Sequence, residues 1–433
     1  MHLAAFLIAG PVAHSHAVWR NPDHPVPFLS LGYYADVART LERGFFDLIF
    51  FADRLAIADR FGNDKTVGIR HGDQDSTRMD PVPVLGALAA VTQHIGLGAT
   101  RSTTYDQPYH IAREFRTLDH LSAGRAAWNV VTSMNDSEAR NFGVTSHLDH
   151  DARYDRADEF MELVFKLWDS WGPDALVLDR EAGVYADPEK VSYVLHDGPY
   201  FKCRGPLNIP PGPQGRPVII QAGASDRGKG FAARWAEIIF NISPNVEHMR
   251  RFTSGVRDDV ASAGRPDNAC KVLPAVMPFV GRTEAEAREK RDRANALVAP
   301  LAGLSTLSAH SNTDLAGLDL DAPVTQLQSS GTQSLIALAS RIARDEGMSL
   351  RDIGRRYGES VMVPQLCGTG RQIAEQLAEM FTSGAADGFV ISPAQLPDSF
   401  AEFVDAVVPE LQRLGVFRRA YAAETLRGNL QAS

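Results

Sequence analysis

The sequence predicts an α/β protein with a (β/α)8 TIM-barrel fold, in which eight parallel strands form a closed ring inside a layer of helices. Short apolar runs alternate with stretches of helical periodicity along the 433 residues, and the alternation occurs eight times. The strand candidates are apolar on both faces, as parallel strands covered by helices are. Such a strict alternation favours a closed barrel over an open sheet.

The elements of this barrel follow one another along the chain. The predicted strands comprise residues 3–9, 48–52, 95–100, 126–132, 218–222, 238–242, 272–280 and 388–392. The predicted helices comprise residues 32–43, 82–92, 108–121, 151–171, 227–235, 246–263, 284–297 and 371–382. Pro108 suits the first turn of the third helix, and Gly124 suits its C-terminal cap. A further amphipathic helix is expected over residues 400–414.

Two stretches interrupt the alternation. Residues 179–215 are rich in Pro and Gly and predict a long excursion with a small hairpin at 194–201. Residues 303–332 are polar and lack periodicity, which is typical of a lid or a disordered loop. We therefore expect one domain over residues 1–433, with both insertions covering the C-terminal face of the barrel.

Composition excludes several classes of protein. The net charge is −9 without a dense basic run, so we expect neither nucleic acid nor an anionic membrane as a partner. Three distant cysteines and no CxxC motif indicate a reducing cytoplasm rather than a disulfide framework. Residues 1–10 resemble a first buried strand more than a signal peptide, and no apolar run approaches the roughly 20 residues that span a bilayer.

The segment from residue 95 to residue 154 carries most of the predicted site. Two strands flank a helix there, and each strand ends in small polar residues, among them Thr100 and Ser102 on the first, while Asn129 lies at mid-strand in the second. Ligands of parallel α/β folds bind at the carboxyl ends of the strands. We expect Asn129 to point inward to a polar ligand, although a buried amide satisfied by the protein is the alternative. Asp53 ends the second strand, as a ligand residue or as a cap of the next turn.

A phosphate site is the second candidate feature. His150 and Tyr154 are four residues apart at the start of a helix, so they share one face, but two surface residues would show the same spacing. Small residues at 223–228 open another helix, where backbone N–H groups can approach an anion. An ordinary strand-to-helix turn is the alternative there. Neither the Walker nor the GxGxxG spacing is present.

A histidine near the first strand is the third candidate. His14 and His16 follow that strand, and one of them could act as an acid, a base or a hydrogen-bond donor. Two solvated loop histidines are the alternative. No third ligand with metal spacing accompanies them, so we expect no metal site.

Several of these motifs resemble those of the bacterial-luciferase-like flavin monooxygenases, in particular the branch that oxidises nitrilotriacetate, EDTA and dibenzothiophene sulfone. The motifs that carry the resemblance are Phe50-Phe-Ala-Asp53, Gly96-Leu-Gly-Ala-Thr100, Leu118-Asp-His-Leu-Ser-Ala-Gly-Arg125-Ala-Ala-Trp-Asn-Val-Val-Thr-Ser133, Ala222-Gly-Ala-Ser225, Asp387-Gly-Phe389 and Val408-Pro-Glu-Leu411. The resemblance covers nearly the whole chain.

The resemblance implies an FMNH2-dependent monooxygenase that uses O2 and takes reduced flavin from a separate NAD(P)H:flavin reductase. It places His14 and Asn129 near the reacting edge of the flavin, as the catalytic residues. The residues that would bind FMN are Asp53, Thr100, Ser102, Asn129, His150, Tyr154, Ala224 and Ser225. Of these, Tyr154 and Ser225 would hold the phosphate.

The resemblance leaves the substrate and two other functions open. The substrate would be a small organic molecule, aromatic, sulfur-containing or halogenated, since no convergent basic cluster is evident in the insertions. A homo-oligomer, dimeric or tetrameric, is expected. The alternatives are a deazaflavin-dependent dehydrogenase with the same barrel and a non-catalytic flavin-binding protein.

Overall fold

The barrel is a closed ring of eight parallel strands. The computed structural model describes residues 1–22, 26–223, 225–325, 327, 329 and 331–432. In chain order the barrel strands are β1 His2–Ile8, β2 Leu48–Ala52, β3 Gly96–Ser102, β4 Ala126–Val131, β9 Val218–Gln221, β10 Ile238–Asn241, β11 Lys271–Val280 and β13 Gly388–Ile391. From β1 to β11, each barrel strand pairs with the next barrel strand along the chain. β11 then pairs with β13, and β13 pairs with β1, which closes the ring. All eight predicted strands are therefore confirmed.

One further strand of the described main sheet was not predicted. β12 (Gln365–Gly368) pairs with the second half of β11, in register with Met277–Val280. β11 is ten residues long and pairs with β10 and β13 only through its first half, so its second half is free to bind another strand. A four-residue run that begins with Gln365 and ends with Gly368 carries too weak an apolar pattern to be recognised as a strand.

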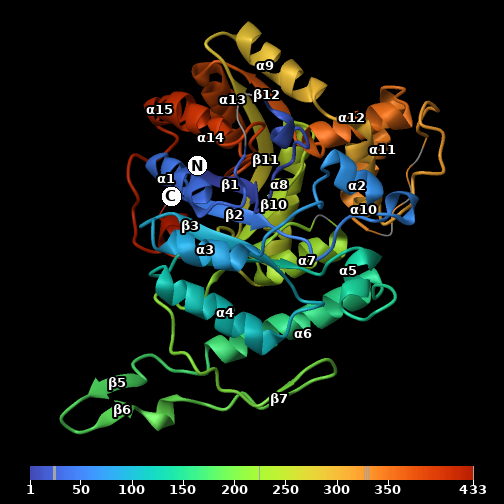
Figure 1. Ribbon diagram of the computed structural model, residues 1–433. Coiled ribbons are helices and arrows are strands. Elements are labelled where there is room, and N and C mark those ends of the chain that lie inside the picture. Colours follow the sequence, from blue (N-terminus) through green and yellow to red (C-terminus); the bar gives the residue numbers. More distant parts are fainter. Residues whose placement is uncertain (23–25, 224, 326, 328, 330, 433) are drawn as a thin grey trace.

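The eight predicted helices surround the ring (Figure 1). They are α1 Leu31–Arg43, α3 Pro81–Ala89, α4 Pro108–Leu121, α6 His150–Trp168, α7 Asp226–Trp235, α8 Val246–Ser262, α9 Glu284–Ala296 and α13 Gly370–Thr382. The predicted terminal helix is α14 (Asp398–Glu402) and α15 (Val408–Arg413), joined by a π-helical turn at Phe403–Val407. No helix in the described part of the chain is both long and apolar enough to span a membrane.

The mouth of the barrel is covered by the insertion between β11 and β12. It contains α10 (Pro300–Ser311), α11 (Gln333–Asp345) and α12 (Leu350–Ser360), and the short helices α2 (Thr66–His71) and α5 (Asp136–Asn141) lie beside it (Figure 1). The prediction that 303–332 is a loop is wrong for its first part, because residues 303–311 belong to α10. Every residue of α10 from Ala302 to Ser311 is buried, so the helix has no polar face and shows no periodicity.

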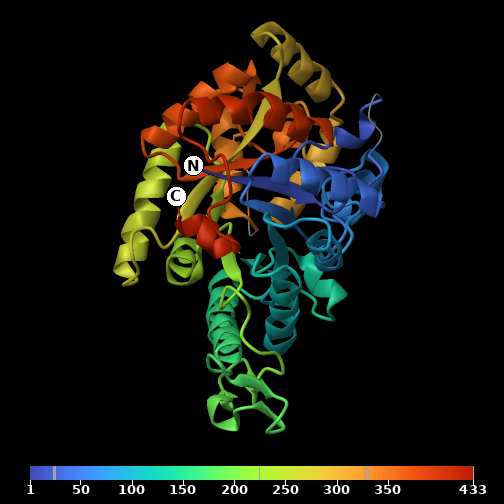
Figure 2. The same cartoon turned by 90° about the vertical axis from the view of Figure 1, so that its left-hand side faces the viewer.

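The other insertion lies elsewhere. Residues 172–204, here called the arm, contain two hairpins, β5 (Leu176–Asp179) with β6 (Val184–Ala186) and β7 (His196–Asp197) with β8 (Lys202–Cys203). The arm packs on the outer side of α6, where Glu159 accepts hydrogen bonds from the backbone N–H groups of Tyr200 and Phe201, at 3.0 and 2.8 Å. Figures 1 and 2 show it beyond α4 and α6, away from α10–α12. The expectation that residues 179–215 cover the mouth is therefore wrong.

The most distinctive sequence motif, residues 118–133, fixes the barrel at the start of β4. The Arg125 guanidinium is buried and donates to the carbonyl oxygens of Ala89, Thr92 and Ile95, at 2.9–3.2 Å. Asp119 accepts a hydrogen bond from Gln214 at 2.6 Å, just before β9. These contacts join α3, β3, β4 and β9. Residues 118–125 of the motif therefore stabilise the fold, and only its second part, the strand β4, reaches the mouth of the barrel.

Candidate active site

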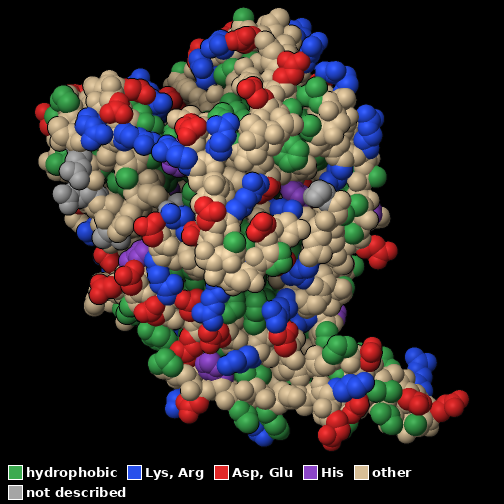
Figure 3. Space-filling view, turned by 180° about the vertical axis from the view of Figure 1, so that it is seen from behind, with side chains coloured by type: hydrophobic (Ala, Val, Ile, Leu, Met, Phe, Trp, Pro, Cys, Tyr) green, Lys and Arg blue, Asp and Glu red, His purple; other side chains and the backbone are tan. Residues whose placement is uncertain are grey.

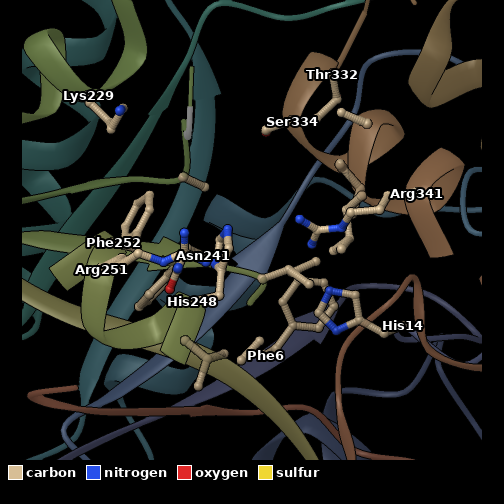
Figure 4. A pocket seen from close by; sticks show the side chains of 18 of the residues that line it. Phe6, His14, Lys229, Asn241, His248, Arg251, Phe252, Thr332, Ser334 and Arg341 are labelled. Carbon is tan, nitrogen blue, oxygen red and sulfur yellow. The ribbon is translucent and has the colours of Figure 1, made fainter. Parts of the chain in front are cut away.

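A cavity of about 690 Å³ opens at the carboxyl ends of the strands (Figure 4). Phe6, Phe50 and Phe240 stand on β1, β2 and β10, and their rings pack edge to face or tilted, with centroids 4.9–5.9 Å apart. The Phe50–Phe240 contact joins strands on opposite sides of the ring. The cavity therefore has an aromatic floor that spans the barrel, suited to a flat apolar molecule.

His14 lines this cavity and is held in one orientation. Its ring stacks on Phe6 with centroids 3.7 Å apart, and its Nδ1 lies 2.7 Å from the Ser392 hydroxyl, at the end of β13. Burial, together with the charges of His16 and Arg78, lowers the pKa of His14 to about 3. His14 is therefore a neutral imidazole whose Nε2 is not engaged by the bond to Ser392. This excludes the alternative of two solvated histidines, since His16 is buried as well.

Thr100 and Asn129 face each other across β3 and β4, where the strand register pairs them. The Asn129 side-chain amide donates to the Thr100 hydroxyl at 2.9 Å, and that hydroxyl donates to the carbonyl oxygen of Phe51 at 3.0 Å. The Oδ1 atom of Asn129 is buried without a hydrogen-bond partner among the residues that the structure describes. A buried acceptor needs a donor, so this side chain is prepared for an N–H or O–H group of a ligand.

Tyr154, His150 and Ser225 come together at the start of α7. His150 Nε2 lies 3.4 Å from the Ser225 hydroxyl, and that hydroxyl caps α7 by accepting from the N–H of Gly228 at 3.1 Å. A methyl group on Gly228 would lie 2.8 Å from the Tyr154 hydroxyl, so glycine is needed for this approach. Burial raises the pKa of Tyr154, which keeps the phenol protonated. The cluster offers hydroxyl donors and the positive end of a helix, and both favour an anion.

Of the predicted site residues that the structure describes, His14 lines this cavity, whereas Thr100, Asn129, His150, Tyr154 and Ser225 do not. The lining reaches Ala222 and Lys229, which flank Ser225 in the chain. Ala224, the remaining predicted residue there, lies outside the described residues. Ser102 is buried and lies 3.0 Å from the Ser133 hydroxyl, where it joins the ends of β3 and β4.

Asp53 follows β2 at the same end of the barrel. Burial raises the pKa of Asp53 to about 6, although the charge of Arg78 opposes the shift. Its carboxylate is therefore poised to gain or lose a proton near neutral pH, which is more typical of a site residue than of a surface cap.

This shift predicts a pH-dependent effect of Asp53→Asn on stability. An acid whose pKa is higher in the folded protein stabilises the fold at low pH, and this stabilisation is lost as the pH rises through about 6. Relative to the wild type, Asp53→Asn should therefore gain stability between pH 5 and pH 7.5. Urea denaturation at both pH values measures the change. A difference that stays constant with pH would show that Asp53 has an ordinary pKa.

Several residues of the site carry no local signal in the sequence. Asp75 forms ion pairs with Arg54 and Arg78 at 2.8 and 2.6 Å and is fully buried beside the mouth. The cavity is also lined by Asn241 and by basic residues from three helices, Lys229, His248, Arg251 and Arg341. Charged residues on helices are common on protein surfaces. Only their convergence on one cavity, which the structure shows, identifies these four as residues of the site. Asn241, an asparagine within a strand as Asn129 is, could have been recognised by the same argument.

Comparison with known proteins agrees with this geometry. A family model described as luciferase-like monooxygenase matches residues 12–387. The chain is 52% identical to a dibenzothiophene-sulfone monooxygenase of Rhodococcus erythropolis (strain XP), over 99% of this chain and 96% of that protein. It is 42% identical to nitrilotriacetate monooxygenase component A of Aminobacter aminovorans, over 95% of this chain and 92% of that protein.

A solved structure is similar over the entire chain. The crystal structure of riboflavin lyase (RcaE) with modified FMN and substrate riboflavin has a TM-score of 0.92 and 33% identity, and the match covers 100% of this chain and 96% of that one. The resemblance noted in the motifs is thus confirmed over nearly all of both chains. The chain belongs to the luciferase-like monooxygenase family and is a flavin-dependent monooxygenase.

Proposed function

We propose that the flavin is FMN, bound in its reduced form and supplied by a separate NAD(P)H:flavin reductase. The observation that carries this proposal is the buried, unpartnered Oδ1 of Asn129. A flavin ring has an N–H donor at its edge, whereas the rest of that edge accepts hydrogen bonds. Thr100 holds the amide so that the oxygen is the atom left for a ligand. Tyr154, His150 and Ser225 would hold the phosphate.

Reduced flavin, when bound, would supply the two electrons with which O2 gives one oxygen atom to the substrate and the other to water. The side chains of this protein would position the substrate, exclude water and transfer a proton. The aromatic floor of Phe6, Phe50 and Phe240 would position a flat substrate, and α11, which lines the cavity from the insertion, would limit the access of water. His14, neutral and fixed by Ser392, can donate or accept one proton at Nε2 beside the substrate.

We further propose that the substrate is a small organic molecule with an aromatic, sulfur-containing body. The 52% identical relative is named for dibenzothiophene sulfone, and the aromatic floor suits such a tricyclic ring system. The deazaflavin and non-catalytic alternatives have no observation in their favour.

The direct test is oxygen labelling. The purified protein, a flavin reductase, NADH, FMN and dibenzothiophene sulfone are incubated under 18O2, and the product is analysed by mass spectrometry. We expect one labelled oxygen atom in the product, and none when the reductase is left out. Flavin-dependent conversion that introduces no label would contradict the proposal.

His14→Leu should separate catalysis from binding in the same assay. Loss of a proton donor or acceptor costs about 10²–10⁴-fold in rate. We therefore expect product formation to fall by at least about 100-fold, with binding of reduced FMN within about threefold of the wild type. A parallel loss of FMN binding would instead place His14 among the flavin ligands.

We also propose that the protein is a homo-oligomer that associates through the arm. The arm stands away from the body (Figure 3). It exposes large apolar side chains along both of its hairpins: Val177, Leu178, Val184, Tyr185, Tyr193, Leu195 and Tyr200. Apolar residues concentrated on a projecting, edge-exposed sheet indicate a contact with another copy. Light scattering should give a multiple of 47.2 kDa for the wild type. A double variant, Tyr185→Ser with Leu195→Ser, should shift the mass towards the monomer.

A further inference from the structure

We propose that the cavity selects an organic anion, with an apolar body on the aromatic floor and a carboxylate, sulfonate or sulfinate group between Arg251 and Arg341. The inference rests on the proposed monooxygenase function for the reaction. It adds a negative charge that dibenzothiophene sulfone lacks, so the neutral sulfone tests the reaction and an anionic aromatic molecule is the preferred substrate. Four observations support it: the sign of the charges around the cavity, their weak neutralisation by the protein, their placement on opposite walls and the polar wall at Asn241.

The charges around the cavity are of one sign. The basic residues that line it are Lys229, His248, Arg251 and Arg341, and none of the described lining residues is Asp or Glu. The whole chain, in contrast, has a net charge of −9. A cleft lined by one sign of charge between low-dielectric walls concentrates ligands of the opposite sign.

These cations are weakly neutralised by the protein. Lys229 is 2.8 Å from Asp226, but Asp226 is fully exposed on the outside of α7. Arg251 lies 3.8 Å from Glu247, and both side chains are about two-thirds exposed, so water screens the pair. Arg341 forms no ion pair within the described part of the chain. A ligand anion would therefore find guanidinium groups with most of their hydrogen-bonding capacity free.

The two arginines lie on opposite walls. Arg251 and His248 extend from α8, whereas Arg341 extends from α11 in the insertion that covers the mouth (Figure 4). Burial lowers the pKa of His248, and the charges of Arg251 and Arg341 lower it further, so both guanidinium groups lie close enough to act on the same imidazole. An anion between the walls would relieve this repulsion and would join α11 to the barrel.

The wall below these cations is polar. The Asn241 amide donates to the Ser243 hydroxyl at 2.8 Å, and this hydroxyl lies 2.9 Å from His248 Nδ1. The Oδ1 atom of Asn241 is buried with no partner among the described residues. A purely hydrocarbon occupant would leave it unsatisfied, which is unfavourable. The cavity is therefore built for a molecule with one apolar end and one hydrated, polar end.

The experiment compares an anion with a neutral molecule of similar shape. Binding of naphthalene-2-sulfonate, naphthalene-2-carboxylate and neutral 2-naphthamide to the flavin-free protein is measured by calorimetry, so the readout does not depend on turnover. We expect the two anions to bind about tenfold or more tightly than the amide, with an affinity that falls as salt increases. Equal affinities for all three would overturn the proposal, even if oxygen labelling confirms the monooxygenase.

Variants of α11 identify the group responsible. Arg341→Gln should weaken anion binding about tenfold or more and leave the amide within about twofold, and Arg341→Lys should restore most of the affinity. Arg344→Gln is the matched control, because Arg344 lies one turn away, is 63% exposed and does not line the cavity. Equal losses for anion and amide would indicate a packing role for Arg341. If Arg341→Gln weakened the binding of FMN and left the binding of riboflavin unchanged, Arg341 would be a ligand of the flavin phosphate. Either result would overturn the proposal.

Discussion

Asp75→Ala should lower the free energy of unfolding by about 3–5 kcal/mol, the cost of removing one partner from a buried ion pair. The Asp75 carboxylate is fully buried and accepts from Arg54 at 2.8 Å and from Arg78 at 2.6 Å, and both guanidinium groups are more than nine-tenths buried. Without the carboxylate, two cations would remain in the protein interior beside the mouth. Since the network fixes the end of β2 through the Arg78 bond to the Ala52 carbonyl, activity should fall as well.

The effect of Asp75 should depend on pH. Burial alone would raise its pKa, but the charges of Arg54 and Arg78 outweigh burial and lower it below the ordinary value. An acid whose pKa is lower in the folded protein stabilises the fold above its unfolded pKa, and this contribution is lost as the pH falls through the folded pKa. The difference between wild type and Asp75→Ala should therefore be constant from pH 5.5 to pH 8 and shrink below about pH 4.

Urea denaturation of wild type and variant measures this difference. Asp36→Ala is the control, because Asp36 forms an exposed pair with Arg39, at 3.4 Å with side chains 79% and 57% exposed, and such pairs contribute about 0–1 kcal/mol. If Asp75→Ala destabilised the protein no more than Asp36→Ala does, the buried network would contribute little to the fold.

Tyr154→Phe should weaken binding of reduced FMN by about ten- to a hundredfold and binding of reduced riboflavin by much less. One charge-assisted hydrogen bond contributes about 1.5–3 kcal/mol, and only FMN carries the phosphate that would receive it. The Tyr154 hydroxyl lies at the start of α7, where Gly228 permits its approach, and removing one oxygen atom leaves the buried ring in place. Anaerobic calorimetry with both reduced flavins measures the two losses.

Tyr109→Phe is the matched control, since its hydroxyl binds Asn208 at 3.3 Å on the outer side of α4. Ser225→Ala is a less direct test, because Ser225 also caps α7 and its removal costs about 1 kcal/mol of stability. Equal losses of FMN and riboflavin on Tyr154→Phe would place the tyrosine against the ring or the substrate, and the proposed orientation of the flavin would be reversed.

Local patterns predicted the barrel because each of its elements carries its own signal. Pro108 and Leu121 bound α4 as expected, since proline at a first turn and an amphipathic pattern depend on neighbours along the chain. The same reasoning failed for α10, whose residues are buried on every side, and for β12, which exists only because β11 continues beyond its other partners. The position of the arm was missed because composition identifies an insertion without indicating the direction in which it leaves the body.

The sequence by itself determined the order of the barrel strands and their helices, the end of the barrel at which the candidate site residues gather, and the residue types there, including Asn129, Tyr154 and His14. Only the tertiary structure decided which of these groups meet. Thr100 orients Asn129 because barrel register places β3 beside β4, and Ser392 orients His14 across 378 residues of chain. Arg251 and Arg341 share one cavity because the barrel closes and an insertion folds over its mouth. Contacts of this kind join residues that are far apart in the chain. Periodicity describes only residues that are close in the chain, so it cannot predict such contacts.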